Sequence, residues 1–290
     1  MSKMRIVVSG ANGQIGKSFQ KITFDWQEYE FHFFDRESLD ITDRASVERV
    51  FSEVGPDVFI NCAAYTAVDR AETERERAYA VNAEALDHIT MFCIQFNTFL
   101  IHYSTDYVYD NGLRIPMDEK SPTSPKSIYA QSKKMGEEVI ARSPVNALIF
   151  RTSWVYSEFG NNFVKTMLRL GKERSILTVV NDQIGAPTFA TDIAHATMKI
   201  VDQLEESPIT GCQILNFCGE GKISWYDFAQ YIFECAEINV NVQAIPSSDY
   251  PTPASRPKWS VLDMTAIKSQ YGIAPKYWKE SVSECVYLLS

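Results

Sequence analysis

Short apolar runs alternate with amphipathic helical patterns along the first half of the chain. Such alternation is typical of βαβ units and predicts an α/β fold built on a doubly wound parallel sheet. The runs, among them VFIN and FLIHYS, are apolar nearly throughout, as expected of parallel strands that helices cover on both faces. We expect strands near residues 4–9, 30–34, 57–61, 98–104 and 146–151. Helical patterns fill the intervals, beginning near Gly13 and near Arg44 and covering residues 67–95 and 125–142.

The pattern changes after Arg151, where loops rich in Gly, Asn, Pro and Trp separate shorter helical stretches. The proline cluster from Pro246 to Pro257 predicts an extended linker or binding loop, because proline fixes φ and disfavours helix in the residue before it. Helices are expected near residues 161–171, 191–204 and 224–236. The sequence thus predicts two domains: residues 1–151 with returning segments near 176–205, and a smaller C-terminal α/β lobe formed mainly by residues 152–290.

The composition is that of an ordinary globular protein, since 45% of the 290 residues are hydrophobic and 22% are charged. The sequence holds no run of about eighteen apolar residues, which a membrane helix would need. A strand-like run follows the first Met directly and leaves no room for a secretory signal, so we expect a cytoplasmic protein. The formal net charge of −9 argues against a nucleic-acid partner, because binding a phosphate backbone requires a basic surface.

The cysteines and histidines are scattered along the chain. The six cysteines form no CxxC pair, and the four histidines are far apart in sequence. The sequence therefore predicts neither a zinc site nor a disulfide framework, but reduced cysteines in the core and no bound metal.

A glycine-rich segment joins the first expected strand to the first expected helix: Gly10-Ala11-Asn12-Gly13-Gln14-Ile15-Gly16. Glycines let the backbone turn tightly and approach a pyrophosphate, and the helix N-terminus offers free N–H groups to phosphates. This context predicts a Rossmann-type dinucleotide site, although a plain strand-to-helix turn would use the same residues. Asp35 and Arg36 end the second strand, where an acid would bind a ribose 2′-hydroxyl and an arginine a 2′-phosphate. Both NADH and NADPH therefore stay open as cofactors.

Tyr129 and Lys133 are four residues apart in a helical pattern and share one helix face. Tyrosine ordinarily has a pKa of about 10, and a nearby ammonium would stabilise the phenolate and lower that pKa. The pair would then suit proton transfer near neutral pH. A tyrosine four residues before a lysine is also common on solvated helix faces. The functional interpretation of the pair therefore depends on the glycine loop earlier in the chain.

The segments GANGQIG and YAQSK together resemble the extended short-chain dehydrogenase/reductases. Along almost the whole chain the resemblance narrows to the dTDP-4-dehydrorhamnose reductase family. It rests on these segments, in this order: LDITD at 39–43, NCAAYTAVDRAE at 61–72, VNAEA at 81–85, STDYVYD at 104–110, RTSWVY at 151–156, NDQIGAPTFATDIA at 181–194 and RPKWSVLD at 256–263. The resemblance implies reduction of the C4 ketone of dTDP-4-dehydro-L-rhamnose to dTDP-L-rhamnose, a precursor of surface polysaccharide, with NADPH or NADH.

Three residues would carry this reaction if the resemblance holds. Tyr129 would protonate the C4 oxygen, and Thr105 would hydrogen-bond the same oxygen as charge develops on it. Lys133 would hold the nicotinamide ribose and lower the pKa of Tyr129. With the glycine loop, the residues expected around the cofactor are Gly10, Asn12, Gly13, Gln14, Ile15, Gly16, Asp35, Arg36, Asp40, Ile41, Ala63, Ala64, Tyr65, Asn82, Tyr129 and Lys133.

The resemblance also implies a sugar-nucleotide site in the smaller lobe. Its expected contacts are Thr105, Asp106, Tyr107 and Trp154 around the hexose, and the loop near Arg256 and Trp259 over the nucleotide. Plainer explanations stay open, because both tryptophans would fit a domain interface and Arg256 would fit a surface ion pair.

The pair Asp106-Tyr107 bears on the class of reaction. Related sugar-nucleotide 4,6-dehydratases carry an Asp-Glu pair directly after the threonine, and without that glutamate the removal of a C5 proton lacks its usual catalyst. Carbonyl reduction is therefore favoured, while an epimerase that returns its hydride is harder to exclude. An alternative of another class is a non-catalytic dinucleotide-binding subunit resembling the regulatory subunit of methionine adenosyltransferase, which would place no chemical demand on Thr105, Tyr129 and Lys133.

One departure from the family concerns the oligomeric state. Some members carry a glutamate just after the glycine loop that helps to bind magnesium at a dimer interface. This chain has Gly16-Lys17-Ser18 at that place. We therefore expect a monomer, or a homodimer that is built without a bridging metal.

Overall fold

Six parallel strands form the central sheet of the protein, whose computed structural model describes residues 3–290. The strands are β1 Arg5–Ser9, β2 Glu30–Phe34, β3 Val58–Asn61, β4 Phe99–Thr105, β5 Ala147–Thr152 and β10 Cys212–Asn216. Their order is β10-β5-β4-β3-β1-β2, so the chain runs outward from β1 to β2 and then from β3 in the opposite direction. In such sheets ligands bind beyond the carboxyl ends of the strands where the order reverses, here between β1 and β3. The predicted doubly wound α/β fold is confirmed.

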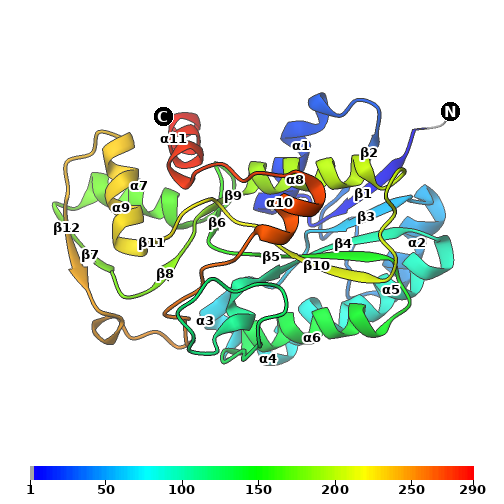
Figure 1. Cartoon of the computed structure of the whole chain (residues 1–290), viewed down its shortest axis with the longest axis horizontal. Coiled ribbons are helices and arrows are strands. Elements are labelled where there is room, and N and C mark those ends of the chain that lie inside the picture. Colours follow the sequence, from blue (N-terminus) through cyan, green and yellow to red (C-terminus); the bar gives the residue numbers. More distant parts are fainter. Residues whose placement is uncertain (1–2) are drawn as a thin grey trace.

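Helices cover both faces of the sheet, as Figure 1 shows. On one face lie α1 Gln14–Ile22 and α8 Ala190–Gln203, and on the other lie α2 Arg44–Val54, α5 Ala85–Phe96 and α6 Ile128–Arg142. Alternate residues of β1 serve the two layers: Val8 packs in the cluster of Phe19, and Val7 packs in the cluster of Phe51. Burying each such side chain contributes about 1.5–3 kcal/mol, which explains why these strands lack a polar face.

The five predicted strands are confirmed to within one residue at each end, whereas the helical pattern over residues 67–95 is not one helix. It divides into α3 Val68–Ala71, α4 Arg75–Tyr79, a π-helical turn η2 Ala80–Glu84 and then α5. The turn lies against α6 at Gly136, where a Cβ atom would overlap the carbonyl oxygen of Asn82. Hydrophobic periodicity reveals neither this interruption nor the contact with another helix that accompanies it.

A second group of elements, here called the C-terminal lobe, comprises α7 Phe163–Glu173, α9 Trp225–Cys235, α11 Trp278–Leu288, β7 Ile176–Val180 and β12 Asn241–Ile245. Its helices enclose a core around Phe228, and β7 pairs in parallel with β12. Short strand pairs adjoin it: β6 Val155–Tyr156 with β9 Thr188–Phe189, and β8 Ile184–Gly185 with β11 Ile223–Ser224. The helices expected near 161–171, 191–204 and 224–236 are confirmed as α7, α8 and α9.

Two parts of the chain return to the sheet after β5. The helix α8 packs against α1, and β10 extends the sheet beside β5. The segment 176–180, expected near the sheet, instead pairs with β12 as β7. The proline cluster is irregular apart from the 3-10 turn η4 Ser247–Asp249, and α10 Thr265–Tyr271 follows it. The division of the chain into two domains stays a prediction.

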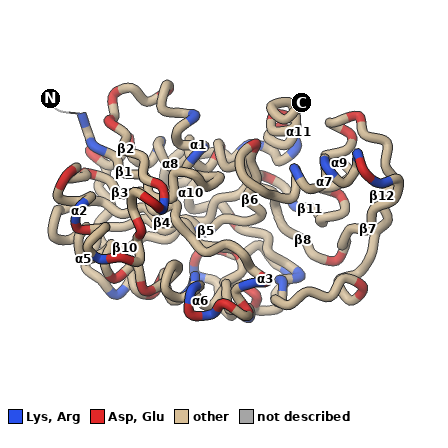
Figure 2. The backbone as a smooth tube through the Cα atoms, turned by 180° about the vertical axis from the view of Figure 1, so that it is seen from behind, with Lys and Arg blue, Asp and Glu red and all other residues tan. Residues whose placement is uncertain are grey.

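Basic and acidic residues interleave over the outer helices (Figure 2). On α6, for example, Lys134 pairs with Glu137 at 3.3 Å and Arg142 with Glu138 at 2.9 Å. Exposed pairs of this kind, such as the second, contribute at most about 1 kcal/mol. Within residues 3–290, none of the helices has the length and apolar character to span a membrane.

Candidate active site

Three hollows follow one another from the carboxyl edge of the sheet into the C-terminal lobe. The loop groove, of about 290 Å³, lies beside the glycine loop at this edge, and the central cavity, of about 520 Å³, contains the Thr-Tyr-Lys set. The lobe cavity, of about 450 Å³, lies beyond the sheet, between α7, β7 and the proline cluster of the C-terminal lobe. The loop groove and the central cavity share Gly13, Cys62 and Ala64. The central cavity and the lobe cavity share Trp225. The three hollows are therefore neighbours, with Trp225 in the wall between the last two.

The glycine loop is pressed against its surroundings so closely that side chains would not fit. Gly10 has φ +65°, and a Cβ atom there would be 2.6 Å from the backbone nitrogen of Ala63. A Cβ atom on Gly16 would be 2.5 Å from the carbonyl oxygen of Gly10. Gly13 is the N-cap residue of α1, so Gln14 and Ile15 begin the helix at the wall of the central cavity. The unpaired N–H groups of this helix N-terminus suit a phosphate group.

The two residues that end β2 differ in their availability. The carboxylate of Asp35 accepts hydrogen bonds from Ser38 and from Nδ2 of Asn12 (3.0 Å), and the Ser38 hydroxyl is the main cause that lowers the pKa of Asp35. Arg36 lines the loop groove with a side chain that is 70% exposed, 3.8 Å from Asp40. The exposed guanidinium of Arg36 could exchange this long contact with Asp40 for a ligand anion, whereas the Asp35 carboxylate already accepts hydrogen bonds within its own turn.

The other predicted cofactor residues fall into two groups. Asn12, Asp40, Ile41, Ala63, Ala64 and Tyr65 line the loop groove. Asn82 lies outside both the groove and the central cavity and is 1% exposed. Its Oδ1 atom accepts the N–H of Tyr65 at 2.8 Å and its Nδ2 donates to the Tyr65 carbonyl at 3.0 Å. We therefore interpret Asn82 as a support that holds the groove wall from behind rather than as a direct contact.

The predicted catalytic residues meet in the central cavity. Thr105 ends β4, and Tyr129 and Lys133 lie in the first two turns of α6, which is capped by the Ser127 side chain. The Thr105 hydroxyl donates to Oδ1 of Asp106 at 3.1 Å. The ring of Tyr107 meets that of Tyr129 edge to face, with centroids 5.9 Å apart. The three side chains thus converge on one hollow that is continuous with the loop groove.

The expected lowering of the Tyr129 pKa is wrong for this arrangement. Burial raises the pKa of Tyr129 to about 12, and its hydrogen bond with the Thr105 side chain offsets only part of that effect. Lys133 is 2% exposed, and its Nζ lies 3.0 Å from Nε2 of His102. Burial lowers the pKa of Lys133 to about 8, although Glu137 acts in the opposite direction. Tyr129 is therefore protonated at neutral pH and is suited to donate a proton.

Asp106 is an unusual carboxyl group in the wall of the central cavity. It is 2% exposed, and within residues 3–290 its Oδ2 atom has no hydrogen-bond partner. Burial raises its pKa to about 7. A buried acceptor without a protein partner is unusual, and one at the wall of a cavity would suit a ligand hydroxyl group if the side chain turned towards it.

A buried ion pair lies next to the predicted catalytic residues. Arg151, at the end of β5, donates from Nε and Nη2 to the two carboxylate oxygens of Glu137 on α6, at 2.8 and 2.6 Å. Ser104 donates to the same carboxylate at 2.7 Å, and Arg151 also bonds the hydroxyl of Tyr109 at 2.6 Å. These contacts join α6, β4 and β5 next to Thr105, and sequence reasoning did not find them.

The tryptophans predicted for the sugar nucleotide lie in different places. Trp154 lines the central cavity and stacks on Trp225, with ring centroids 3.6 Å apart, so Trp225 is a wall residue that the sequence analysis missed. Trp259 donates from Nε1 to the carbonyl of Ile115 at 2.8 Å and is not among the described residues that line the three hollows. The expectation that Trp259 contacts the nucleotide directly receives no support from this position.

Arg256 lines the lobe cavity and also makes the ion pair that sequence reasoning left open. Its two Nη atoms lie 3.0 and 2.7 Å from the carboxylate oxygens of Asp69, just after the start of α3. The pair joins the proline cluster to the sheet side of the site. Arg256 therefore stands where a ligand anion in the lobe cavity would compete with Asp69.

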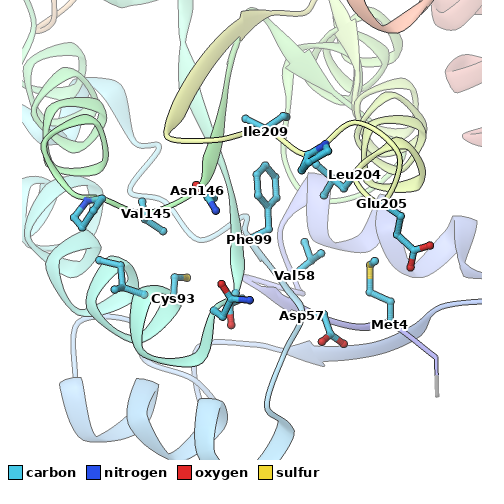
Figure 3. A pocket seen from close by; sticks show the side chains of 15 residues that line it. Met4, Asp57, Val58, Cys93, Phe99, Val145, Asn146, Leu204, Glu205 and Ile209 are labelled. Atoms are coloured by element: carbon cyan, nitrogen blue, oxygen red, sulfur yellow. The ribbon is translucent and has the colours of Figure 1, made fainter. Parts of the chain in front are cut away.

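A fourth hollow, of about 320 Å³, lies at the opposite, amino-terminal edge of the sheet (Figure 3). Its polar side chains accept hydrogen bonds from backbone N–H groups where strands begin. Asn146 accepts the N–H of Gly211 at 2.9 Å, and Asp57 accepts the N–H of Arg5 at 2.7 Å. Its described lining includes no predicted site residue. Chemistry is therefore to be sought at the carboxyl edge. The described residues also contain no group of three or more His, Cys, Asp or Glu side chains that could hold a metal ion.

Comparisons with known proteins agree with this geometry. The family model described as "RmlD substrate binding domain" matches residues 4–290. The chain is 41% identical to the dTDP-4-dehydrorhamnose reductase of Aggregatibacter actinomycetemcomitans, over 96% of this chain and 97% of that protein. It is 38% identical to the reductase of the same name from Sinorhizobium fredii, over 99% and 98%. A crystal structure of dTDP-4-dehydrorhamnose reductase from Bacillus anthracis in complex with NADP is similar at TM-score 0.92 and 36% identity, covering 99% of this chain and 100% of that one.

Proposed function

This chain belongs to the RmlD substrate binding domain family, and on that premise we propose that it is an NAD(P)H-dependent oxidoreductase that reduces dTDP-4-dehydro-L-rhamnose to dTDP-L-rhamnose. The product would serve as a precursor of surface polysaccharide. The observation that carries the proposal is the meeting of Thr105, Tyr129 and Lys133 in a cavity that continues into the loop groove. A dinucleotide bound along the groove would end beside these three residues.

The residues present fit a dinucleotide cofactor. Side chains at Gly10 and Gly16 would fill the space in which the loop approaches β3 and α1, and the N-terminus of α1 faces the groove. NADPH, when bound, supplies the hydride for the sugar C4 atom. Tyr129 donates its phenolic proton to the C4 oxygen, and Thr105 hydrogen-bonds that oxygen as it becomes negative. Lys133 would hold the nicotinamide ribose of the bound cofactor.

The hexose would occupy the rest of the central cavity. Asp106 supplies an acceptor for a sugar hydroxyl, Tyr107 packs against Tyr129, and Trp154 forms the wall on the lobe side. Arg256, in the lobe cavity, would bind the diphosphate after exchanging Asp69 for it. Tyr107 stands where a dehydratase carries glutamate, which supports reduction rather than loss of water.

Arg36 makes NADPH the preferred cofactor in this proposal. Arg36→Ala is expected to raise the KM for NADPH about tenfold and to change the KM for NADH little, because one charge-assisted hydrogen bond to the 2′-phosphate is worth about 1.5 kcal/mol. Steady-state kinetics with both cofactors measure the effect. Arg44→Ala removes another exposed arginine that does not line the groove and is the control. Equal losses with both cofactors would contradict the assignment.

The function itself is tested by incubating the protein with dTDP-4-dehydro-L-rhamnose and reduced cofactor and following cofactor absorbance and product. We expect stoichiometric formation of dTDP-L-rhamnose. If no dTDP-4-ketohexose oxidised the cofactor while the cofactor still bound, a non-catalytic regulatory subunit would replace the enzyme as the better interpretation.

The proposal also covers the cellular compartment, the oligomeric state and the division of binding between two domains. The protein acts in the cytoplasm, as a monomer or as a homodimer without a bridging metal. Residues 1–151, with α8 and β10 returning to them, bind the dinucleotide, and the remainder mainly binds the sugar nucleotide. The Gly16-Lys17-Ser18 sequence after the loop supports the absence of a bridging metal.

A further inference from the structure

A row of buried polar side chains crosses the sheet beneath the catalytic lysine. Ser9, Asn61 and His102 occupy adjacent register positions on β1, β3 and β4, and each is at most 1% exposed. The Ser9 hydroxyl donates to Oδ1 of Asn61 at 2.7 Å, and Nδ2 of Asn61 lies 3.1 Å from Nδ1 of His102. Nε2 of His102 lies 3.0 Å from Nζ of Lys133. These groups have no role in the reaction as described above.

A backbone group fixes the direction of these hydrogen bonds. The N–H of Ala63 points at Oδ1 of Asn61 at 3.2 Å, and a backbone N–H can only donate. The carboxamide of Asn61 must therefore present Nδ2, a donor, to Nδ1 of His102, which has to accept. A neutral imidazole that accepts at Nδ1 carries its proton on Nε2. Burial is the main cause, ahead of the charge of Lys133, that holds the pKa of His102 well below its ordinary value, so the ring stays neutral.

The Nε2–H of His102 consequently points at Nζ of Lys133. A neutral amine can accept this hydrogen bond with its lone pair, whereas an ammonium group has only donors. The contact with His102 therefore favours the neutral amine of Lys133 over its ammonium form. An ammonium group at the same place would leave two donors facing each other in a buried site, which is unfavourable.

We propose that His102 is a positioning residue that holds the neutral amine of Lys133 and turns the ammonium form into the central cavity towards Tyr129. This inference rests on the proposed reductase function, since it assigns a step to the same site. The ammonium is the working form. It stabilises the phenolate that remains when Tyr129 has given its proton away, and the amine returns to His102 afterwards.

The proton balance of this cycle closes without another reactant. The O–H bond of Tyr129 breaks as its proton joins the sugar oxygen. An N–H bond of the Lys133 ammonium then breaks as that proton restores the phenol, and the neutral amine accepts the hydrogen bond from Nε2 of His102. Water that enters through the open cavity protonates the amine again. One solvent proton is consumed for each ketone that is reduced.

The proposal predicts how activity depends on pH. Burial lowers the pKa of Lys133 to about 8, so kcat should fall as pH rises through about 8 and the ammonium is lost. Glu137 on α6 and His102 on β4 face the amine, and Tyr129 stays protonated over this range. Asp106 on η3 Asp106–Tyr109 has a pKa raised to about 7, so its titration comes first as pH rises. Asp106→Asn identifies that contribution, because it should remove a transition near 7 and leave the one near 8.

The tautomer of His102 can be measured without any turnover. Two-bond proton–nitrogen correlation spectra of the holoenzyme, labelled with nitrogen-15 at its four histidines, should show one ring that stays neutral from pH 5 to 9 with its proton on Nε2. Replacing His32, His88 and His195 one at a time with glutamine assigns the remaining ring by elimination. A His102 ring protonated at Nδ1 would overturn the proposal, whatever the enzyme assay shows.

Asn61→Asp reverses the hydrogen-bond direction and gives the second test. A carboxylate accepts from Ala63, from Ser9 and also from Nδ1–H of His102, so Nε2 becomes an acceptor for the ammonium of Lys133. The His102 tautomer should change to Nδ1–H. The basic limb of the pH profile, which is the fall of kcat as pH rises through about 8, should move to a higher pH by about one unit or more. A purely structural role would lower kcat at every pH without moving the limb, and that result would refute the proposal.

His102→Gln keeps the test informative if the aspartate variant does not fold. The glutamine amide can turn either way and can therefore receive both forms of Lys133, so the basic limb should also move upward. An unchanged limb in a folded His102→Gln enzyme would contradict the positioning role. Absence of any reduction by the wild-type enzyme would instead remove the proposed function and leave the tautomer measurement valid.

Discussion

Tyr129→Phe is expected to lower kcat at least about 100-fold while cofactor binding and the free energy of unfolding change little. A positioned acid contributes roughly 100-fold to 10,000-fold to a rate. Burial raises the pKa of Tyr129 to about 12, so the phenol holds its proton until the sugar oxygen becomes the stronger base. Phenylalanine keeps the ring that packs edge to face on Tyr107 and removes only the transferable proton. Single-turnover and steady-state rates, measured with saturating NADPH and sugar nucleotide, report the loss.

Tyr79→Phe is the matched control for this substitution. The hydroxyl of Tyr79, on α4, lies 3.3 Å from Oε1 of Gln131 on α6, and Tyr79 is not among the described residues of the three hollows. The control also deletes one tyrosine hydroxyl bonded to α6, and its kcat should stay close to the wild-type value. If Tyr129→Phe kept more than about a tenth of the wild-type rate, the sugar oxygen would receive its proton from another group.

Glu137→Ala is expected to lower the free energy of unfolding by about 3–5 kcal/mol, the cost of leaving one charge of a buried pair uncompensated. The guanidinium of Arg151 is 2% exposed and would lose both of its bonds to the carboxylate. Ser104 would lose its acceptor as well. Equilibrium unfolding in urea measures the change, and because Ser104 precedes Thr105 on β4, kcat should also fall.

Glu138→Ala is the control, because Glu138 is the next residue on α6 and its pair with Arg142 is exposed. Its effect should stay below about 1 kcal/mol. Burial alone would raise the pKa of Glu137, but Arg151 outweighs it and holds the pKa below the ordinary value. The stability from this pair is therefore fully present above the unfolded-state pKa and is lost as pH falls through the lowered folded-state pKa. Equal effects of the two substitutions at neutral pH would contradict the buried pair.

The central sheet could be predicted because its strands are buried on both faces and contain few polar residues. The exception is β10, whose sequence CQILN includes the half-buried Gln213 and follows a loop, so its apolar run is too short to stand out. The division of residues 67–95 into several helices could not be predicted from the sequence either. It lies where Gly136 approaches Asn82, and these residues are far apart in the sequence.

Some residues of the candidate site could likewise be predicted from the sequence, and others could not. Tyr129, Lys133 and the glycine loop could be predicted because their spacing on one helix or turn carries the signal. His102 and Asn61 lie inside apolar strands, where a single polar residue is ordinarily a satisfied core group, so nothing along the chain marked them. The pKa of Tyr129 was wrongly expected to fall, because spacing alone does not reveal that Lys133 turns to His102 or how deeply the phenol is buried.

The strand β10 makes the sheet depend on chain that is synthesised late. Its residues pair with β5 along Ala147–Arg151, and they follow α7, β7 and α8 in the sequence. A nascent chain that ends before residue 212 would expose the open side of β5, with unpaired backbone groups available to other chains. The complete six-stranded sheet can therefore form only after residues 212–216 have been synthesised, and we expect a fragment that ends after β5 to aggregate more readily than the whole chain.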